Sequence, residues 1–246
     1  MMAAREQDLS TVEGINLRAA ISYVNNGYAL VPLRSPESAE QWNSDHPDAQ
    51  KHTKMPVIKN WQSEPIRTMA QARAQWGPYP TRGIGIVAGE AYGVLWLDAD
   101  EKYGGLIHLA DRIDEHGAFP HNTLRNRTGG GGLQIGFAYP VGSGIRNSSN
   151  TTIGIDFRAG CIVDGKNEGT GQCAVFPTVH PSGIQYKWAA EQAPWNIPCT
   201  ELALSLPPQA GHPTLGRTIP GKEVSSAQSS SSLPARVPSR GRAPLP

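Results

Sequence analysis

The 246-residue sequence lacks a strong excess of either charge, because its 22 Lys and Arg residues are nearly balanced by 21 Asp and Glu residues. The formal net charge of +1 excludes a global basic field of the kind that attracts nucleic acid to the whole surface of a protein. Any site for a polyanion must therefore be local, built from a few cations in one place.

Cysteines and long apolar runs are also scarce. Cys161, Cys173 and Cys199 have irregular spacing, which excludes a disulfide scaffold and a Cys-x-x-Cys zinc site. No apolar stretch approaches the length of a membrane span, and the first residues lack the apolar core of a signal peptide. We therefore expect a reduced, cytoplasmic protein without a membrane segment.

The end of the chain differs in composition from the rest. From Ser205 onward it contains eight prolines, a serine run and scattered arginines. A segment of this kind has too few apolar residues to bury a core. We expect one folded domain in residues 1–204 and a disordered tail in residues 205–246.

Hydrophobic periodicity in the first 204 residues predicts both helices and strands. Helices are expected at residues 10–27, 68–76 and 106–117, and a polar loop is expected through about residue 53. A hairpin tip is expected at residues 164–169. Strands are expected at residues 28–33, 83–89, 94–98, 123–128, 133–138, 153–158, 173–177 and 184–188. This order of elements predicts a mixed α/β class.

The chain is organised around the apolar run Val94-Leu95-Trp96-Leu97, which ends at Asp98 and Asp100. On a strand these two carboxylates share one face, about 7 Å apart at the backbone, so they repel each other. A divalent cation such as Mg²⁺ or Mn²⁺ removes that repulsion, since hard cations prefer oxygen ligands. The simpler interpretation is that the two aspartates only cap the helix that follows.

Two later strands carry polar residues on one face. Leu133, Ile135 and Phe137 alternate with smaller or polar residues, so Gln134 points away from the core. In residues 153–158, Asp156 and Arg158 share the face opposite Ile155 and Phe157 in the same way.

Several segments occur in a recognisable order: Leu-Asp-Ala-Asp at 97–100, Gly-Gly at 104–105, Thr-Gly-Gly-Gly-Gly-Leu-Gln at 128–134 and Gly-Ile-Asp-Phe-Arg at 154–158. Pro-Thr-Val-His-Pro-Ser-Gly at 177–183 and Tyr-Lys-Trp at 186–188 follow them. This ordered set resembles the primase/polymerase (prim-pol) domain of bifunctional DNA primase/polymerases, in the archaeo-eukaryotic primase superfamily. The resemblance covers about residues 17–190.

The resemblance implies an α+β fold with an RRM-like antiparallel sheet, joined to an N-terminal α/β unit. It implies a DNA-directed nucleotidyltransferase that acts in replication of a mobile element, phage or plasmid. The implied partners are a DNA template and primer, nucleoside triphosphates and a replicative helicase. The implied catalytic residues are Asp98, Asp100 and Asp156, which would hold two Mg²⁺ or Mn²⁺ ions. The implied nucleotide-binding residues are Gln134, Arg158, Thr128, Gly132 and Lys54.

One residue departs from the family pattern. The second motif of the family ends in a histidine, expected to contact nucleotide phosphates, where this chain has Gln134. An amide donates a hydrogen bond but carries no positive charge. This departure leaves an alternative: a prim-pol-like replication accessory that binds DNA or nucleotide with weakened catalysis. A third interpretation is an unrelated Asp-x-Asp enzyme, such as a glycosyltransferase or a topoisomerase-primase-type nuclease, which explains the first motif alone.

The composition of residues 205–246 yields a first test. A chain that ends at Leu204 should melt within a few degrees of the full-length protein, because the removed segment carries little that can pack. The measurement is thermal unfolding followed by circular dichroism. A large drop in melting temperature would show that the tail docks on the folded domain.

Overall fold

The computed structural model describes residues 12–45, 53–150, 152–189, 192–194, 196 and 200–201. Residues 1–206 form one compact unit, and all that follows concerns that unit. The predicted tail and the first two residues of the helix predicted at 10–27 lie outside the described residues. Of the helices within these ranges, none is both long enough and apolar enough to cross a bilayer.

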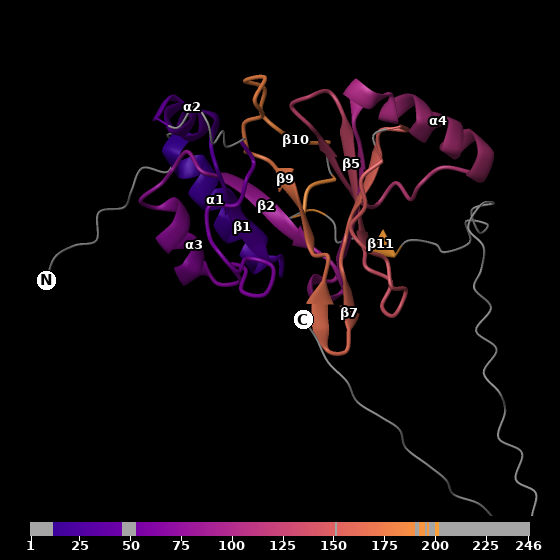
Figure 1. Cartoon of the computed structure of the whole chain (residues 1–246), viewed down its shortest axis with the longest axis horizontal. Coiled ribbons are helices and arrows are strands. Elements are labelled where there is room, and N and C mark those ends of the chain that lie inside the picture. Colours follow the sequence, from indigo (N-terminus) through magenta and orange to yellow (C-terminus); the bar gives the residue numbers. More distant parts are fainter. Residues whose placement is uncertain are drawn as a thin grey trace, which may run out of the picture. The chain divides into compact units, whose positions relative to one another are not determined.

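The N-terminal part is an antiparallel sheet covered by helices (Figure 1). Its strands are β1 (Leu30–Leu33), β2 (Gly83–Ala88) and β9 (Gly171–Val175), with β2 in the centre. The helices are α1 (Val12–Asn25), α2 (Pro36–Asp45) and α3 (Met69–Trp76). Tyr23 and Trp76 are fully buried in the core beneath α1 and α3, together with Ile84 and Ile86 of β2.

A second sheet has the strand order β10-β4-β5-β3-β6 and is antiparallel along this path. The strands are β10 (Lys187–Trp188), β4 (Leu124–Arg127), β5 (Leu133–Ala138), β3 (Val94–Ala99) and β6 (Ile155–Arg158), and β11 (Thr200–Glu201) pairs with β5. Helix α4 (Gly105–His116) covers one face, where Leu97, Leu109 and Ile135 pack together. Because side chains alternate along a strand, the polar residues of β3, β5 and β6 lie on the other face.

The structure confirms the α+β class and most of the predicted elements. Pro32 lies in β1, which is an edge strand as a strand proline requires. Thr68 and Gln71 form the capping box at the start of α3. The predicted hairpin tip is formed by β7 (Cys161–Val163) and β8 (Lys166–Glu168) around a tight turn. Cys161 and Cys173 are both buried and free, so they do not pair across this hairpin.

Two predictions were wrong in extent. The polar loop predicted before residue 53 contains α2, whose first turn is capped by the Ser35 hydroxyl accepting from the Ser38 N–H at 3.2 Å. Pro36 suits the first position of this helix. Ala39 is the buried residue of α2, and one small buried side chain does not produce a hydrophobic periodicity that would predict a helix. The last predicted strand shortens to Lys187–Trp188, because residues 181–186 form a turn and an isolated bridge at Gln185.

Glycines hold the end of β3 against the start of β6. The 3-10 helices η1 (Glu90–Tyr92) and η2 (Glu101–Tyr103) flank β3, and α4 begins directly after Gly104, whose φ of 74° is left-handed. A Cβ on Gly105 would overlap the Gly154 carbonyl oxygen and lie 2.6 Å from the Asp100 nitrogen. That carbonyl accepts from the Asp100 N–H at 2.8 Å, so this close approach fixes Asp100 beside β6.

Gly105→Ala should therefore destabilise the protein by about 3 kcal/mol, the upper range for overpacking, because backbone atoms must move. For a domain of this size that corresponds to a fall in melting temperature of roughly 6–12 °C. The matched control is Gly27→Ala, where φ is 85° but no atom lies within 4 Å, and where a left-handed alanine costs about 1 kcal/mol. Equal losses in the two variants would contradict the close-packing argument.

Candidate functional site

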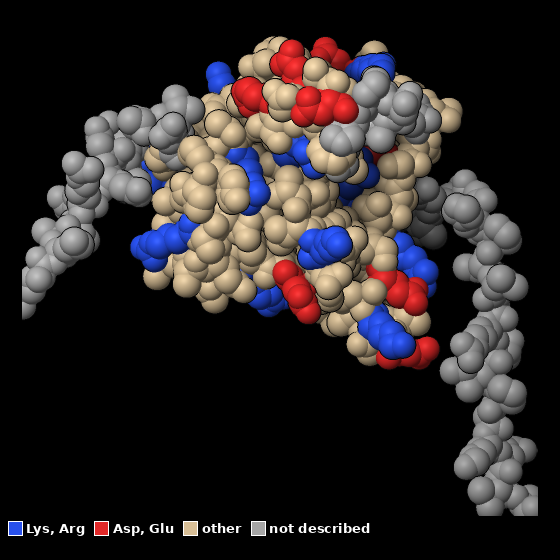
Figure 2. Space-filling view, turned by 60° about the vertical axis from the view of Figure 1, so that its left-hand side comes forward, with Lys and Arg blue, Asp and Glu red and all other residues tan. Residues whose placement is uncertain are grey.

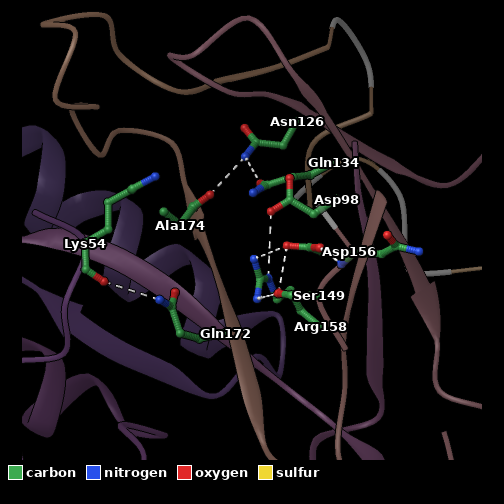
Figure 3. Close-up of polar contacts among 10 residues, drawn as sticks. Lys54, Asp98, Asn126, Gln134, Ser149, Asp156, Arg158, Gln172 and Ala174 are labelled. Carbon is green, nitrogen blue, oxygen red and sulfur yellow. Dashed lines mark hydrogen bonds and ion pairs between the residues drawn. The ribbon is translucent and has the colours of Figure 1, made fainter. Parts of the chain in front are cut away.

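A row of polar side chains crosses the second sheet from β4 to β6 (Figure 3). Asn126 is paired in register with Gln134, Gln134 with Asp98, and Asp98 with Asp156. Residues directly opposite in antiparallel strands have Cα atoms about 4.5–5.5 Å apart and point to the same face. Three residues predicted from separate motifs, Gln134, Asp98 and Asp156, are therefore neighbours on the face away from α4.

Arg158 lies between the two carboxylates. Its Nη2 is 2.6 Å from Asp156 Oδ2, and its Nε is 3.8 Å from Asp98 Oδ2. The Asp98 side chain is only 20% exposed, and burial raises its pKa. The charge of Asp156 raises the Asp98 pKa further, while Arg158, Gln134 and Lys54 lower it. The ionised carboxylates of Asp98 and Asp156 therefore require a nearby cation, and Arg158 supplies it.

The carboxylate of Asp156 is held by the loop that precedes β6. Ser149 Oγ donates to Asp156 Oδ2 at 3.1 Å, and the Asn150 backbone N–H donates to Oδ1 at 2.8 Å. Arg158 Nη1 also donates to Ser149 Oγ at 3.3 Å. The sequence analysis missed Ser149 and Asn150, whose only signal was the polar run just before the strand.

Asp100 lies just beyond β3, which ends at Ala99. Its backbone is extended, with φ −89° and ψ 120°, and its exposed side chain accepts from the Lys102 N–H at 2.9 Å. Asp100 therefore caps the short helix η2, and the N-cap of the longer helix α4 is Gly104. Within the described ranges, no three His, Cys, Asp or Glu side chains are already grouped closely enough to hold a metal ion.

A pocket of about 360 Å³ opens between the two sheets beside this row. Asp98, Gln134 and Arg158 line one wall, and β9 supplies the opposite wall through Gly171, Gln172, Cys173 and Ala174. Aromatic rings of Trp61 and Tyr186 also line it, with Lys54, Asn147 and Thr170. The pocket therefore joins two cations, the Asp98 carboxylate and aromatic surface in one place.

Lys54 enters the pocket from a strained backbone position. Its φ of 66° is left-handed, a conformation that costs a non-glycine residue on the order of 1 kcal/mol. The backbone is held there because Lys54 N–H donates to the Arg34 carbonyl at 3.1 Å and Gln172 Nε2 donates to the Lys54 carbonyl at 3.3 Å. Burial lowers the Lys54 pKa, and the charges of Asp98 and Asp100 oppose that shift.

The glycine turn after β4 packs against the end of β3. Thr128 Oγ1 accepts from the Gly132 N–H at 2.9 Å, which closes the turn. A Cβ on Gly132 would overlap the Ala99 carbonyl oxygen, so the turn approaches β3 as closely as glycine allows. Thr128 and Gly132, both predicted to bind nucleotide, thus shape the backbone beside Asp100.

His180 lies against the same turn. Its Nδ1 accepts from the Ser182 N–H at 3.1 Å, which puts the proton of the neutral ring on Nε2. Nε2 would be 3.2 Å from a Cβ on Gly130. Burial and the charge of Lys54 lower the His180 pKa, while Asp100 raises it. The sequence analysis did not assign His180 to the site.

The charge pairing predicts how Arg158 contributes to stability. Arg158→Met should cost about 2 kcal/mol without divalent metal, since hydrogen bonds to charged groups are worth about 1.5–3 kcal/mol. In an Asp98→Asn background the same change should cost less, because only Asp156 then loses its cation. The measurement is a double-mutant cycle by chemical denaturation with a chelator present. An identical loss in both backgrounds would mean that Arg158 does not stabilise Asp98.

Comparison with known proteins identifies the family of the chain that carries this site. No curated protein matches the chain. The family model described as bifunctional DNA primase/polymerase, N-terminal (Prim-Pol), matches residues 20–208, which include both sheets, the pocket and the row of polar side chains. Because this match spans well over half of the sequence, the chain belongs to the Prim-Pol family of bifunctional DNA primase/polymerases.

Proposed function

We propose that this protein is a DNA primase/polymerase that joins nucleotides to a primer 3′-hydroxyl under the direction of a DNA template. The observation that carries the proposal is the pairing of Asp98 with Asp156 in register, at the wall of a pocket that also holds Arg158 and Lys54. Family membership supports the same reaction class. The finer assignments below rest on the chemistry of the residues.

The donor set suits hard divalent cations. Asp98 and Asp156 offer carboxylate oxygens from facing positions, and Asp100 lies two residues beyond Asp98. Burial and, to a smaller extent, the charge of Asp156 raise the pKa of Asp98, and a cation bound beside both carboxylates would favour their ionised forms. We propose that these three aspartates hold two Mg²⁺ or Mn²⁺ ions. When bound, such ions lower the pKa of the attacking hydroxyl and neutralise charge on the triphosphate.

Cationic side chains at the pocket would bind the triphosphate. The Arg158 guanidinium can engage two phosphate oxygens at once, and Lys54 offers a point charge from the facing loop. Arg158 would then exchange a carboxylate partner for phosphate while the metal compensates Asp98 and Asp156. Thr128 and Gly132 would contribute by holding the glycine turn closed beside Asp100.

The surface charge supports a DNA partner. Figure 2 shows Lys and Arg side chains over the middle of one face; Asp and Glu side chains gather towards its upper edge and also alternate with Lys and Arg in its lower part. The cations in the middle of this face suit the phosphates of a template or primer. We further propose that the chain acts in replication of a mobile element, phage or plasmid, in partnership with a replicative helicase.

A binding module without turnover is the second candidate. The observation in its favour is that Gln134 is only 3% exposed and its Oε1 accepts from Asn126, so this end of the amide is not offered to a ligand. A replication accessory of this kind would retain the pocket and bind DNA or nucleotide. The facing aspartates argue for catalysis, because two neighbouring carboxylates that share one arginine still repel each other, and a bound metal would reduce that repulsion.

Primer extension and dinucleotide synthesis with Mn²⁺ separate the two candidates. Wild type should form product, and Asp98→Asn and Asp156→Ala should each reduce the rate more than about a hundredfold, beyond the loss typical of outer-shell partners of metal ligands. Asp114→Asn on the exposed side of α4 is the matched control and should leave the rate unchanged. A wild type that binds DNA and nucleotide but makes no product would support the accessory module instead.

A further inference from the structure

Hydrogen bonds run from the backbone of β9 through Asn126 to Gln134 (Figure 3), and Gln134 is paired in register with Asp98. Asn126 Nδ2 donates to the Ala174 carbonyl oxygen at 3.1 Å and to Gln134 Oε1 at 2.7 Å. Gln134 is the cross-strand neighbour of Asp98, and with its oxygen turned to Asn126 its amide nitrogen is the end that can donate to the Asp98 carboxylate. These contacts connect the two walls of the pocket through two buried amides.

The direction of this relay follows from its first member. A backbone carbonyl only accepts hydrogen bonds, so the nitrogen of the Asn126 amide has to face Ala174. That nitrogen also faces Gln134, which therefore presents its oxygen to Asn126 and its NH₂ group to Asp98. One carbonyl group thus sets the orientation of two amides whose oxygen and nitrogen ends would otherwise be interchangeable.

The burial of the relay argues against a purely stabilising role. Asn126 is 0% exposed and Gln134 is 3% exposed. Asn126 Oδ1 is buried without a hydrogen-bond partner among the residues that the structure describes. An unpaired buried acceptor is destabilising, and an apolar side chain of similar shape would avoid it. The position nevertheless carries an amide, the group that orients Gln134.

We propose that Asn126 is a positioning residue of the pocket, which acts through Gln134 to present an N–H donor to Asp98. This inference rests on the proposed function, in which Asp98 is a metal ligand. A donor of this kind fixes the orientation of a ligating carboxylate, as partners of metal ligands commonly do. It also assigns Gln134 to Asp98 rather than to nucleotide phosphate, since its oxygen accepts from Asn126 and Asp98 is its cross-strand neighbour.

Asn126→Asp is the sharpest variant, because a carboxylate at this position can only accept. Gln134 should then turn its NH₂ group towards residue 126 and its oxygen towards Asp98, which reverses the relay. Asn126→Leu removes the relay without adding charge, and it covers the case in which Asn126→Asp does not fold. Asn25→Asp, at an exposed position at the end of α1, is the control for the change of charge.

The first readout needs neither metal nor activity. In ¹⁵N spectra of the metal-free protein, the side-chain amide signal of Gln134 should shift in Asn126→Leu and in Asp98→Asn, because each removes one partner. The side-chain amide of Gln185, which donates to the Pro177 carbonyl at 3.0 Å, should not shift. If the Gln134 signal shifts in neither Asn126→Leu nor Asp98→Asn, the relay is refuted, and this result does not depend on the reaction that the protein catalyses.

The second readout is Mn²⁺ affinity and steady-state kinetics. Asn126→Asp and Asn126→Leu should weaken Mn²⁺ binding about tenfold and lower kcat by about ten- to a hundredfold, with the KM for nucleotide little changed. A raised KM for nucleotide with unchanged Mn²⁺ affinity would overturn the proposal and make this amide pair part of the nucleotide site. If the wild-type protein forms no product in primer extension, the proposed function is refuted. The relay is tested separately, by the ¹⁵N signal of the Gln134 amide.

Discussion

The structure depends on how the charge of Asp98 is compensated at a largely buried point between two sheets. Burial and the facing Asp156 both disfavour the ionised carboxylate. Arg158, Gln134 and Lys54 favour it, and they arrive from β6, from β5 and from the loop before α3. A single carboxylate therefore requires three separate segments to converge. An ionised group in such a position is stable only when its partners are fixed in place.

Close backbone approach fixes those segments. Gly105 lets the Gly154 carbonyl reach the Asp100 N–H, and Gly132 lets the glycine turn rest on the Ala99 carbonyl. On the far side of the pocket, β9 is tied to the second sheet through Ala174 and Asn126. The two glycine contacts lie at the end of β3, and the Asn126 contact joins β4 of the same sheet to β9, so the sheet that carries Asp98 is also held from the first sheet. The packing thus serves the site as much as the core.

The row of polar side chains lowers the stability of the fold, which favours a functional explanation for its presence. Asn126, Gln134, Asp98 and Asp156 occupy neighbouring positions on a sheet face where apolar residues would pack more stably. Proteins retain such local conflicts mainly where activity needs them. In a member of the Prim-Pol family, nucleotidyl transfer is the activity that would use facing carboxylates with adjacent cations. Gln134, which replaces a histidine of the family pattern, fits this row as a partner of Asp98.

The sequence by itself determined most of the strands, and in β5 and β6 it also determined which face is polar. Alternation about Leu133, Ile135 and Phe157 was enough to put Gln134, Asp156 and Arg158 on faces away from the core, because the side-chain period of a strand is two residues. The helix predicted at residues 68–76 is likewise present as α3, and it begins with the capping box of Thr68 and Gln71. These are local properties, decided by neighbours within a few residues.

Only the tertiary structure decided what each polar group touches. The pairing of Asp98 with Asp156, the anchoring of Asp156 by Ser149, and the left-handed backbone of Lys54 all depend on contacts between distant segments. Asn126 showed no signal in the sequence, because its amide acquires a direction only when β9 brings the Ala174 carbonyl beside it. Sequence patterns specify faces, whereas hydrogen-bond direction and charge compensation arise from strand register and from the meeting of the two sheets.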